Sequence, residues 1–147
     1  MAAQKAIALD VQEYLGTVFM ADLPKDIAAN VKSLLGVINE VLTKFGSGRK
    51  ITSGYRSIEH HRKIYNKINA DRAKTGLPAL KIPMGSAHLS GLAIDLEDAN
   101  GDLDEWCVEN IDWLTEKGVY IEHPDHTKGW CHMQLRASKS GNNPFIP

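Results

Sequence analysis

A histidine and an aspartate, His88 and Asp95, stand seven residues apart within the segment 86–96 and could bind a metal ion together. Residues 92–96 are typical of a short buried strand whose one charge is Asp95, and a carboxylate is costly to bury unless it is paired or binds a metal. Gly91 permits a sharp turn or a close backbone approach, which would bring His88 back over Asp95. These two side chains would supply two of the three protein ligands of a catalytic zinc site, whose fourth position stays open for water.

The third ligand is expected to be His132, in the run 129–136. The run alternates as a strand does, with Trp130, His132 and Gln134 on one face and Cys131, Met133 and Leu135 on the other. If this strand lies beside the strand of Asp95, the three ligands meet. On spacing alone, the alternative is an ordinary hydrogen-bonded His–Asp pair in a domain without a metal.

Three sequence elements follow one another between about residues 50 and 136. They are residues 53–57 (Ser-Gly-Tyr-Arg-Ser), the pattern Ser86-x-His88-x-x-Gly91-x-Ala93-x-Asp95, and the pair Trp130-x-His132. In this order they resemble the D-alanyl-D-alanine carboxypeptidase family, which includes vancomycin-resistance carboxypeptidases and dipeptidases and phage L-alanyl-D-glutamate endopeptidases. The middle pattern matches the zinc-binding signature of that family position for position.

The resemblance implies one Zn²⁺ ion held by His88, Asp95 and His132, and hydrolysis of a peptide bond in peptidoglycan stem peptides. A zinc ion with such ligands lowers the pKa of bound water to about 7 and polarises a peptide carbonyl. The bond is either the terminal D-Ala-D-Ala bond or an internal L-Ala-D-Glu bond, as in an endolysin. The alternative is a catalytically inactive zinc-binding module with a structural or wall-binding role.

Four further residues are expected at the substrate. The resemblance implies that Arg56 engages a substrate carboxylate or the developing oxyanion, whereas a surface salt bridge is the alternative without the motif. Tyr55 lies in the same element and is expected to contact substrate. Ser86 is expected to hold the ligand loop by a hydrogen bond, and Trp130 to form a wall of the site.

The general base is the point at which the chain departs from the family. Many relatives place a glutamate three residues before the last histidine, where this chain has Gly129. The carboxypeptidase branch instead places histidines in the loop before the strand, and this loop holds Glu122, His123, Asp125 and His126. We expect His126 to act as base or transition-state stabiliser with Asp125 orienting it, narrowly ahead of His123.

An acidic turn follows the Asp95 strand. Five acidic and amide residues have the spacing of a calcium-binding loop: Asp98, Asn100, Asp102, Asp104 and Glu109. Leu103, however, occupies the position at which that loop needs glycine. We therefore expect a turn that caps the next helix, with a calcium ion at 98–109 as the less favoured alternative.

Composition limits the partners. The net charge is −1 without a basic excess, which argues against a nucleic-acid partner, and no stretch is apolar enough to enter a membrane. The apolar run after Lys5 ends at Asp10, too early for a signal peptide. We expect a monomer that is made in the cytoplasm and delivered to the cell wall by other factors, through phage lysis or within a virion. Two cysteines, Cys107 and Cys131, are expected to be reduced and apolar-facing.

The order of elements predicts how the ligands are positioned. Helices are expected over 10–19, 27–45, 57–68 and 103–117, and strands over 50–54, 92–96, 119–121 and 129–136. Residues 69–83 are expected to form a surface loop, with His60 and His61 at the surface. The chain is predicted to be one α+β domain with a helical lead-in (1–49), a metal-site core (50–136) and a tail (137–147). The resemblance implies a Hedgehog/DD-peptidase-like fold, whose small antiparallel sheet carries the zinc.

Overall fold

The structure, a computed structural model, describes residues 6–147 and has the predicted α+β architecture, with a small antiparallel sheet. The strands are β1 (Ile51–Ser53), β2 (Ala93–Asp98), β3 (Tyr120–Ile121) and β4 (Gly129–Gln134), arranged in the order β1-β2-β4-β3. The helices are α1 (Val11–Leu15), α2 (Lys25–Phe45), α3 (Ile58–Lys74), α4 (Asp102–Glu109) and α5 (Ile111–Glu116). Residues 1–5, part of the N-terminal segment expected to contain no signal peptide, lie outside the described residues.

Helix α2 packs with the apolar face of the sheet in one core. Its apolar residues recur at helical spacing and are buried together: Val31, Leu34, Leu35, Ile38, Val41 and Leu42. A fully buried leucine contributes about 2 kcal/mol of hydrophobic free energy, so this stripe anchors α2 to the core. The helix ends at Gly46, whose φ of 95° is a left-handed conformation that glycine adopts without strain. The predicted helix and its end are therefore confirmed.

The sheet separates an apolar face from the face that carries the site. Strands β2 and β4 are antiparallel, and their register pairs Ile94 with Met133 and Asp95 with His132. Ile94 and Met133 are completely buried in the same cluster as the α2 stripe, whereas Asp95 and His132 lie on the opposite face. The predicted neighbouring strands and their alternation are confirmed.

Helix α1 fastens the N-terminal region to the strands. Its buried Tyr14 donates a hydrogen bond from the hydroxyl to the carbonyl of Ala93 at 2.8 Å, and its own carbonyl accepts from Tyr55 N at 3.1 Å. Asp10 accepts hydrogen bonds from two backbone N–H groups of the first turn. The helix is shorter than the predicted 10–19, because the chain turns at Gly16 with φ 67°.

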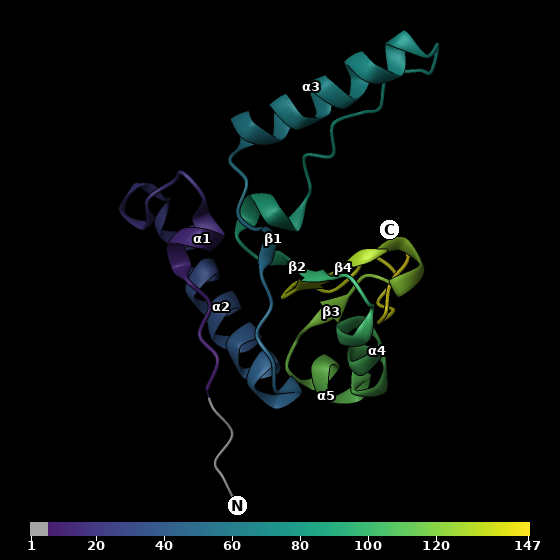
Figure 1. Cartoon of the computed structure of the whole chain (residues 1–147). Helices are drawn as coiled ribbons and strands as arrows, with labels where there is room; N and C mark the ends of the chain where they lie inside the picture. Colours follow the sequence, from purple (N-terminus) through teal and green to yellow (C-terminus); the bar gives the residue numbers. More distant parts are fainter. Residues whose placement is uncertain (1–5) are drawn as a thin grey trace, which may run out of the picture.

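Helix α3 and the segment after it project from the sheet as an arm, seen at the top of Figure 1. The expected loop over 69–83 is therefore wrong for its first part, because α3 continues to Lys74. The side chain of Asn69 makes two hydrogen bonds with the backbone of Leu80, and Arg72 Nε donates to the carbonyl of Pro78. These bonds tie the helix to the returning chain and explain why polar residues continue it.

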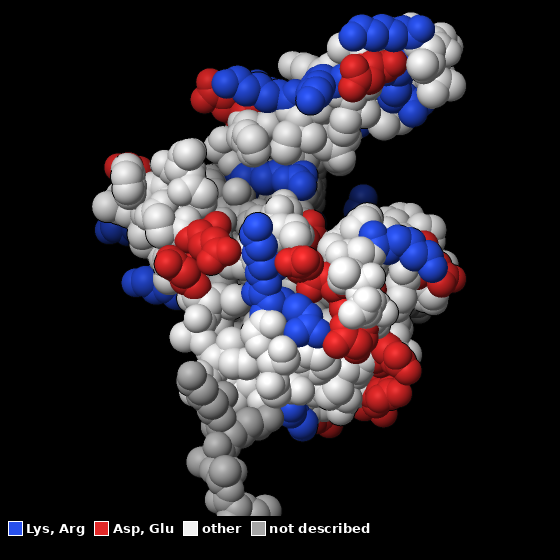
Figure 2. Space-filling view, viewed as in Figure 1, with Lys and Arg blue, Asp and Glu red and all other residues white. Residues whose placement is uncertain are grey.

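The arm is rich in basic side chains. Figure 2 shows blue side chains along it, and the sequence places Arg62, Lys63, Lys67, Arg72, Lys74 and Lys81 there. At its base, His61 is only 1% exposed, and its Nε2 lies 2.9 Å from the carbonyl of Pro83. The expectation that His61 lies at the surface is thus wrong, because this side chain joins the two halves of the arm. His60 is exposed as expected.

The acidic turn after β2 caps a helix. Both carboxylate oxygens of Asp98 accept backbone hydrogen bonds, from Leu103 N at 3.0 Å and Asp104 N at 2.8 Å, and Asp102 forms an ion pair with Arg49. The turn therefore caps the start of α4, as the sequence analysis predicted. Within residues 6–147, the carboxylates of 98–109 do not form a group of three His, Cys, Asp or Glu side chains close enough to hold a metal ion.

The predicted helix 103–117 is divided into α4 and α5 at Asn110. The Asn110 side chain donates to the carbonyl of Trp106 at 2.8 Å and so competes with the backbone for a helical acceptor. Cys107 on α4 and Cys131 on β4 are both buried and not bonded to each other as a disulfide, as predicted. No helix in the described part of the chain is long and apolar enough to cross a membrane.

Candidate metal centre

Hydrogen bonds within the protein orient His88. It lies in a short 3₁₀ helix, Ala87–Ser90, where Ser86 Oγ accepts a hydrogen bond from His88 N at 3.3 Å, as expected. The His88 Nδ1 atom lies 2.8 Å from the carbonyl of Gly54. Because a carbonyl only accepts, Nδ1 carries the proton and Nε2 is left as the ligand nitrogen.

The turn after His88 brings the ligand over the strand. Gly91 has φ 70°, and a Cβ at this position would lie 2.8 Å from the Val31 side chain. Both the left-handed backbone and the close approach of α2 therefore require glycine here. This turn leads the chain from His88 directly into β2, so His88 Nε2 comes within 3.4 Å of Asp95 Oδ2.

Asp95 lies between the two histidines. His132 Nδ1 is 2.7 Å from Asp95 Oδ1, while His88 Nε2 approaches the other carboxylate oxygen. The side chains are 8% (His88), 14% (Asp95) and 12% (His132) exposed, so the cluster is largely buried and still reaches the surface. The sequence analysis predicted that the three side chains lie together, and the register of β2 with β4 places Asp95 beside His132.

The electrostatics of the cluster favour a negative charge on Asp95 and a positive charge on His132. Burial alone would raise the pKa of Asp95, but hydrogen bonds from His132 and His88 outweigh it and hold that pKa well below its usual range. Burial alone would lower the pKa of His132, but the hydrogen bond to Asp95 and its charge raise it instead. A cation at this position would take over the role of the imidazolium proton.

The donor set fits a divalent metal ion. One ligand atom from each of His88, Asp95 and His132 can be chosen so that all three lie within 4.8 Å of one another, and these residues form the one such group in residues 6–147. Two imidazoles and one carboxylate are a ligand set used by catalytic zinc sites. The three side chains can therefore hold a metal and leave a coordination position toward solvent.

Arg56 lies beside the cluster on the β1 side. Its backbone N donates to the carbonyl of His88 at 3.2 Å, and its Nη2 donates to Ser53 Oγ at 3.1 Å. Within residues 6–147, no carboxylate forms an ion pair with Arg56, so the salt-bridge alternative has no partner there. The guanidinium is half-buried and keeps donors for an anionic group.

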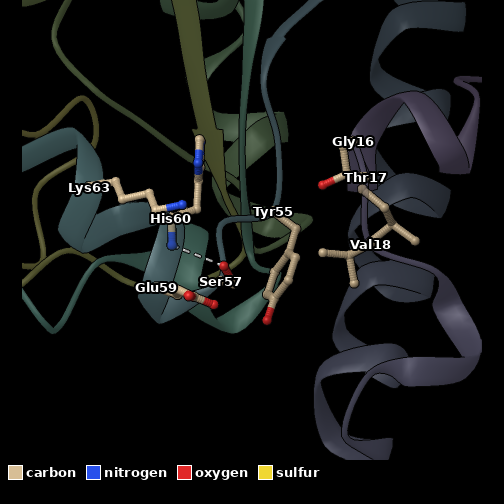
Figure 3. A pocket seen from close by; sticks show the side chains of 9 residues that line it. Gly16, Thr17, Val18, Tyr55, Ser57, Glu59, His60 and Lys63 are labelled. Atoms are coloured by element: carbon tan, nitrogen blue, oxygen red, sulfur yellow. Dashed lines mark hydrogen bonds between the residues drawn. The ribbon is translucent and has the colours of Figure 1, made fainter.

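Tyr55 lines a hollow next to Arg56. Figure 3 shows Tyr55 between the loop that carries Thr17 and Val18 and the start of α3 with His60, and the hollow measures about 380 Å³. A second hollow of about 320 Å³ continues from it past Arg56 and Ser53. Tyr55 lines both hollows and Arg56 lines the second, and no side chain of the group His88, Asp95 and His132 is among the residues that line them.

Another hollow, of about 600 Å³, lies on the His132 side. It is lined by Gln134, Arg136, Lys139 and Phe145. The Phe145 ring stands edge-on to the His132 ring at 6.0 Å, and its backbone bonds to Ile121 and His123. The tail, expected only as a loop, thus contributes to the site. No local pattern in the sequence signals the role of Phe145.

The residues of the β3–β4 loop are arranged differently from the expectation. Asp125 lies next to His123, with 3.6 Å between Asp125 Oδ2 and His123 Nδ1, and the preferred pairing of Asp125 with His126 is not found. Asp125 and His126 are exposed and His123 is half-buried. Trp130 lies on the same face of β4 as His132 and is half-buried, where it borders the site.

Glu122 is the acidic group that the sequence analysis did not select. The β3–β4 register continues past Ile121, so Glu122 faces His132, and Glu122 N donates to the His132 carbonyl at 3.3 Å. Asp95, His132 and Glu122 therefore form one row on the same face of the sheet. Burial raises the pKa of Glu122, partly offset by the His132 charge. The pairing of β3 with β4 places Glu122 there, and the local sequence gives no signal of it.

Two histidines and one carboxylate, with an arginine beside them, are a donor set that catalytic metal sites of hydrolases use. The comparison with protein families names the class of hydrolase, because the model VanY, D-alanyl-D-alanine carboxypeptidase, matches residues 22–123. The chain belongs to this family. The matched region contains Arg56, His88 and Asp95 and ends before His132. No curated protein and no solved structure gave a significant match.

Proposed function

We propose that the protein is a zinc peptidase that hydrolyses a peptide bond in peptidoglycan stem peptides. The observation that carries the proposal is the group His88, Asp95 and His132, whose ligand atoms lie within 4.8 Å on the solvent side of the sheet in a chain of the VanY family. All three ligands come from one chain, which supports a monomer as the active unit. The family supplies the substrate class, and the donor set supports zinc.

His88 Nε2, an Asp95 oxygen and a His132 nitrogen would hold the ion. When bound, zinc would supply a Lewis acid that polarises the peptide carbonyl and lowers the pKa of a water molecule to about 7. Arg56, which has no carboxylate partner in residues 6–147, binds a substrate carboxylate or the developing oxyanion.

Glu122 takes the role of proton acceptor in place of the missing glutamate at position 129. Its carboxylate oxygen accepts a proton from the attacking water and returns it to the leaving amine. Its place in the row beside His132 and its raised pKa support this role. His126 and His123 remain predicted alternatives, which single substitutions can distinguish.

Two hollows support an internal bond as the second candidate substrate, because Arg56, which lines one, bonds to the His88 backbone, and Gln134, which lines the other, bonds to the His132 ring. A carboxypeptidase needs room for one terminal residue beyond the scissile bond. Here about 320 Å³ lies open on the Arg56 side and about 600 Å³ on the His132 side. Both volumes could hold peptide residues, so an endopeptidase of the endolysin type is the second candidate beside the D-Ala-D-Ala carboxypeptidase.

The alternative to an enzyme is a zinc-binding module without turnover, favoured by Gly129 at the usual position of the base. Either activity requires access to the cell wall, and we propose that other factors deliver the protein there, in phage lysis or as part of a virion.

Synthetic stem pentapeptides test the proposal. Zinc-loaded wild-type protein and His132→Ala are incubated with the peptide, and mass spectrometry identifies the products. Free D-alanine would identify a carboxypeptidase, and free L-alanine would identify cleavage before D-glutamate. Zinc binding by the wild type without any product, from soluble peptide or from intact peptidoglycan, would contradict the enzyme and favour the module.

A further inference from the structure

We propose that Gln134 is a positioning residue of the metal centre: it fixes the tautomer of His132 so that Nδ1, and not Nε2, is the nitrogen offered to the metal. This inference rests on the proposed function, because it takes His132 as a zinc ligand. It adds a residue that neither the family match nor the sequence motifs single out, since residue 134 lies beyond the matched region.

The orientation of the Gln134 amide is set by its own neighbour. Gln134 is only 7% exposed, and its Nε2 donates to the carbonyl of Arg136 at 2.7 Å. A carbonyl cannot donate, so the amide nitrogen must occupy that end and the amide oxygen must point the other way. Arg136 is held in turn by a hydrogen bond from its Nη2 to the carbonyl of Gly85.

The amide oxygen then determines which nitrogen of His132 carries hydrogen. Gln134 Oε1 lies 2.8 Å from His132 Nε2, and an amide oxygen only accepts. His132 Nε2 must therefore donate. The other nitrogen, Nδ1, lies 2.7 Å from Asp95 Oδ1 and donates to that carboxylate in the metal-free protein, and a metal ion that replaced this proton would bind Nδ1.

In the metal-bound protein the two histidines would thus hold opposite tautomers, each set by an oxygen acceptor at the nitrogen that does not bind the metal. His88 donates from Nδ1 to the carbonyl of Gly54 and offers Nε2, whereas His132 donates from Nε2 to Gln134 and offers Nδ1. Both offered nitrogens point at Asp95. Partners of this kind orient ligand rings, and their loss typically weakens metal affinity about 10- to 100-fold.

Two substitutions of Gln134 distinguish its role in orienting His132 from its contribution to packing. Gln134→Leu keeps a side chain of similar size but removes the acceptor, whereas Gln134→Glu keeps an acceptor at the same reach. Zinc affinity is measured by competition with a chromophoric chelator, and circular dichroism checks the fold of each variant. We expect Gln134→Leu to bind zinc about 10- to 100-fold more weakly than wild type and Gln134→Glu to stay within a few-fold of it.

A long-range proton–nitrogen correlation spectrum of the wild-type imidazole rings reads the tautomer directly and does not depend on how the variants fold. In the zinc-loaded protein the inference requires hydrogen on Nε2 of His132 and on Nδ1 of His88. Hydrogen on Nδ1 of His132, or a folded Gln134→Leu variant with wild-type zinc affinity, would overturn it. If the wild-type protein binds no zinc, both this inference and the proposed function fail. If it binds zinc through Nδ1 of His132 but hydrolyses nothing, only the proposed function fails.

Discussion

Asp95 and His132 face each other across neighbouring antiparallel strands, and Asp95 Oδ1 lies 2.7 Å from His132 Nδ1. Because the register sets this pairing, the contact is built into the sheet and exists without a metal. The same carboxylate reaches His88 with its second oxygen. Asp95 is therefore the residue on which the geometry of the whole cluster depends.

Replacing Asp95 by asparagine should abolish tight zinc binding. The Asp95→Asn side chain keeps its size but loses the charge that balances the ion, so zinc affinity should fall by more than about 100-fold, beyond the loss seen for a residue that only supports a ligand. The measurement is a chelator competition titration. Asp112→Asn, at an exposed position on α5, is the matched control and should bind zinc as the wild type does. Similar affinities for the two variants would exclude Asp95 as a ligand.

Replacing Glu122 by glutamine should stop turnover while zinc stays bound. Glu122→Gln removes the proton acceptor without a change of size, and general-base catalysis contributes about 10²- to 10⁴-fold, so kcat should fall by that factor. His126→Ala and His123→Ala are measured alongside and should retain much more of the activity. A large loss of kcat in His126→Ala, together with an active Glu122→Gln, would show that His126 and not Glu122 is the general base.

The metal-free protein should be most stable at mildly acidic pH. Asp95 has a lowered pKa in the folded state, so its contribution is present above the ordinary value of 3.8 and is lost as pH falls through the lower folded value. His132 has a raised pKa, so its contribution is complete below 6.5 and is lost as pH rises through the higher folded value. Thermal melts of chelator-treated protein across pH should show this window. Asp95→Asn should flatten it, and an unchanged profile would contradict the coupling.

Restoring the glutamate of other family members at position 129 should destabilise the fold. Gly129 has φ 95°, a conformation that costs a residue with a side chain roughly 1–3 kcal/mol, although no atom blocks the space. Gly129→Glu and Gly129→Ala should therefore lose similar amounts of unfolding free energy in chemical denaturation. The alanine variant isolates the backbone strain from any effect of the new carboxylate. A stable and more active Gly129→Glu would show that the base belongs at this position after all.

The sequence predicted the parts of the site that depend on local periodicity. The alternation of residues 129–136 placed His132 and Gln134 on one face, and Gly91 indicated the turn that returns His88 to the strand. The α2 stripe and its glycine end followed from helical spacing. Each of these features is encoded within a single helix, turn or strand.

Features that depend on distant contacts were missed. Glu122 and Phe145 join the site only through pairing with β4 and Ile121, which local sequence does not reveal. Helix α3 continues past Asn69 because that side chain bonds to the returning chain at Leu80. Polar composition alone therefore indicated a loop where tertiary hydrogen bonds extend a helix.

The most direct test of the central claim is stem-peptide hydrolysis by a single preparation measured when zinc-loaded, after chelation, and after zinc is returned. The proposed zinc peptidase should cleave one defined bond, lose that activity on chelation and recover it with zinc, while His132→Ala stays inactive throughout. Activity that survives complete removal of metal would contradict the account. So would the absence of any product from protein in which bound zinc has been verified.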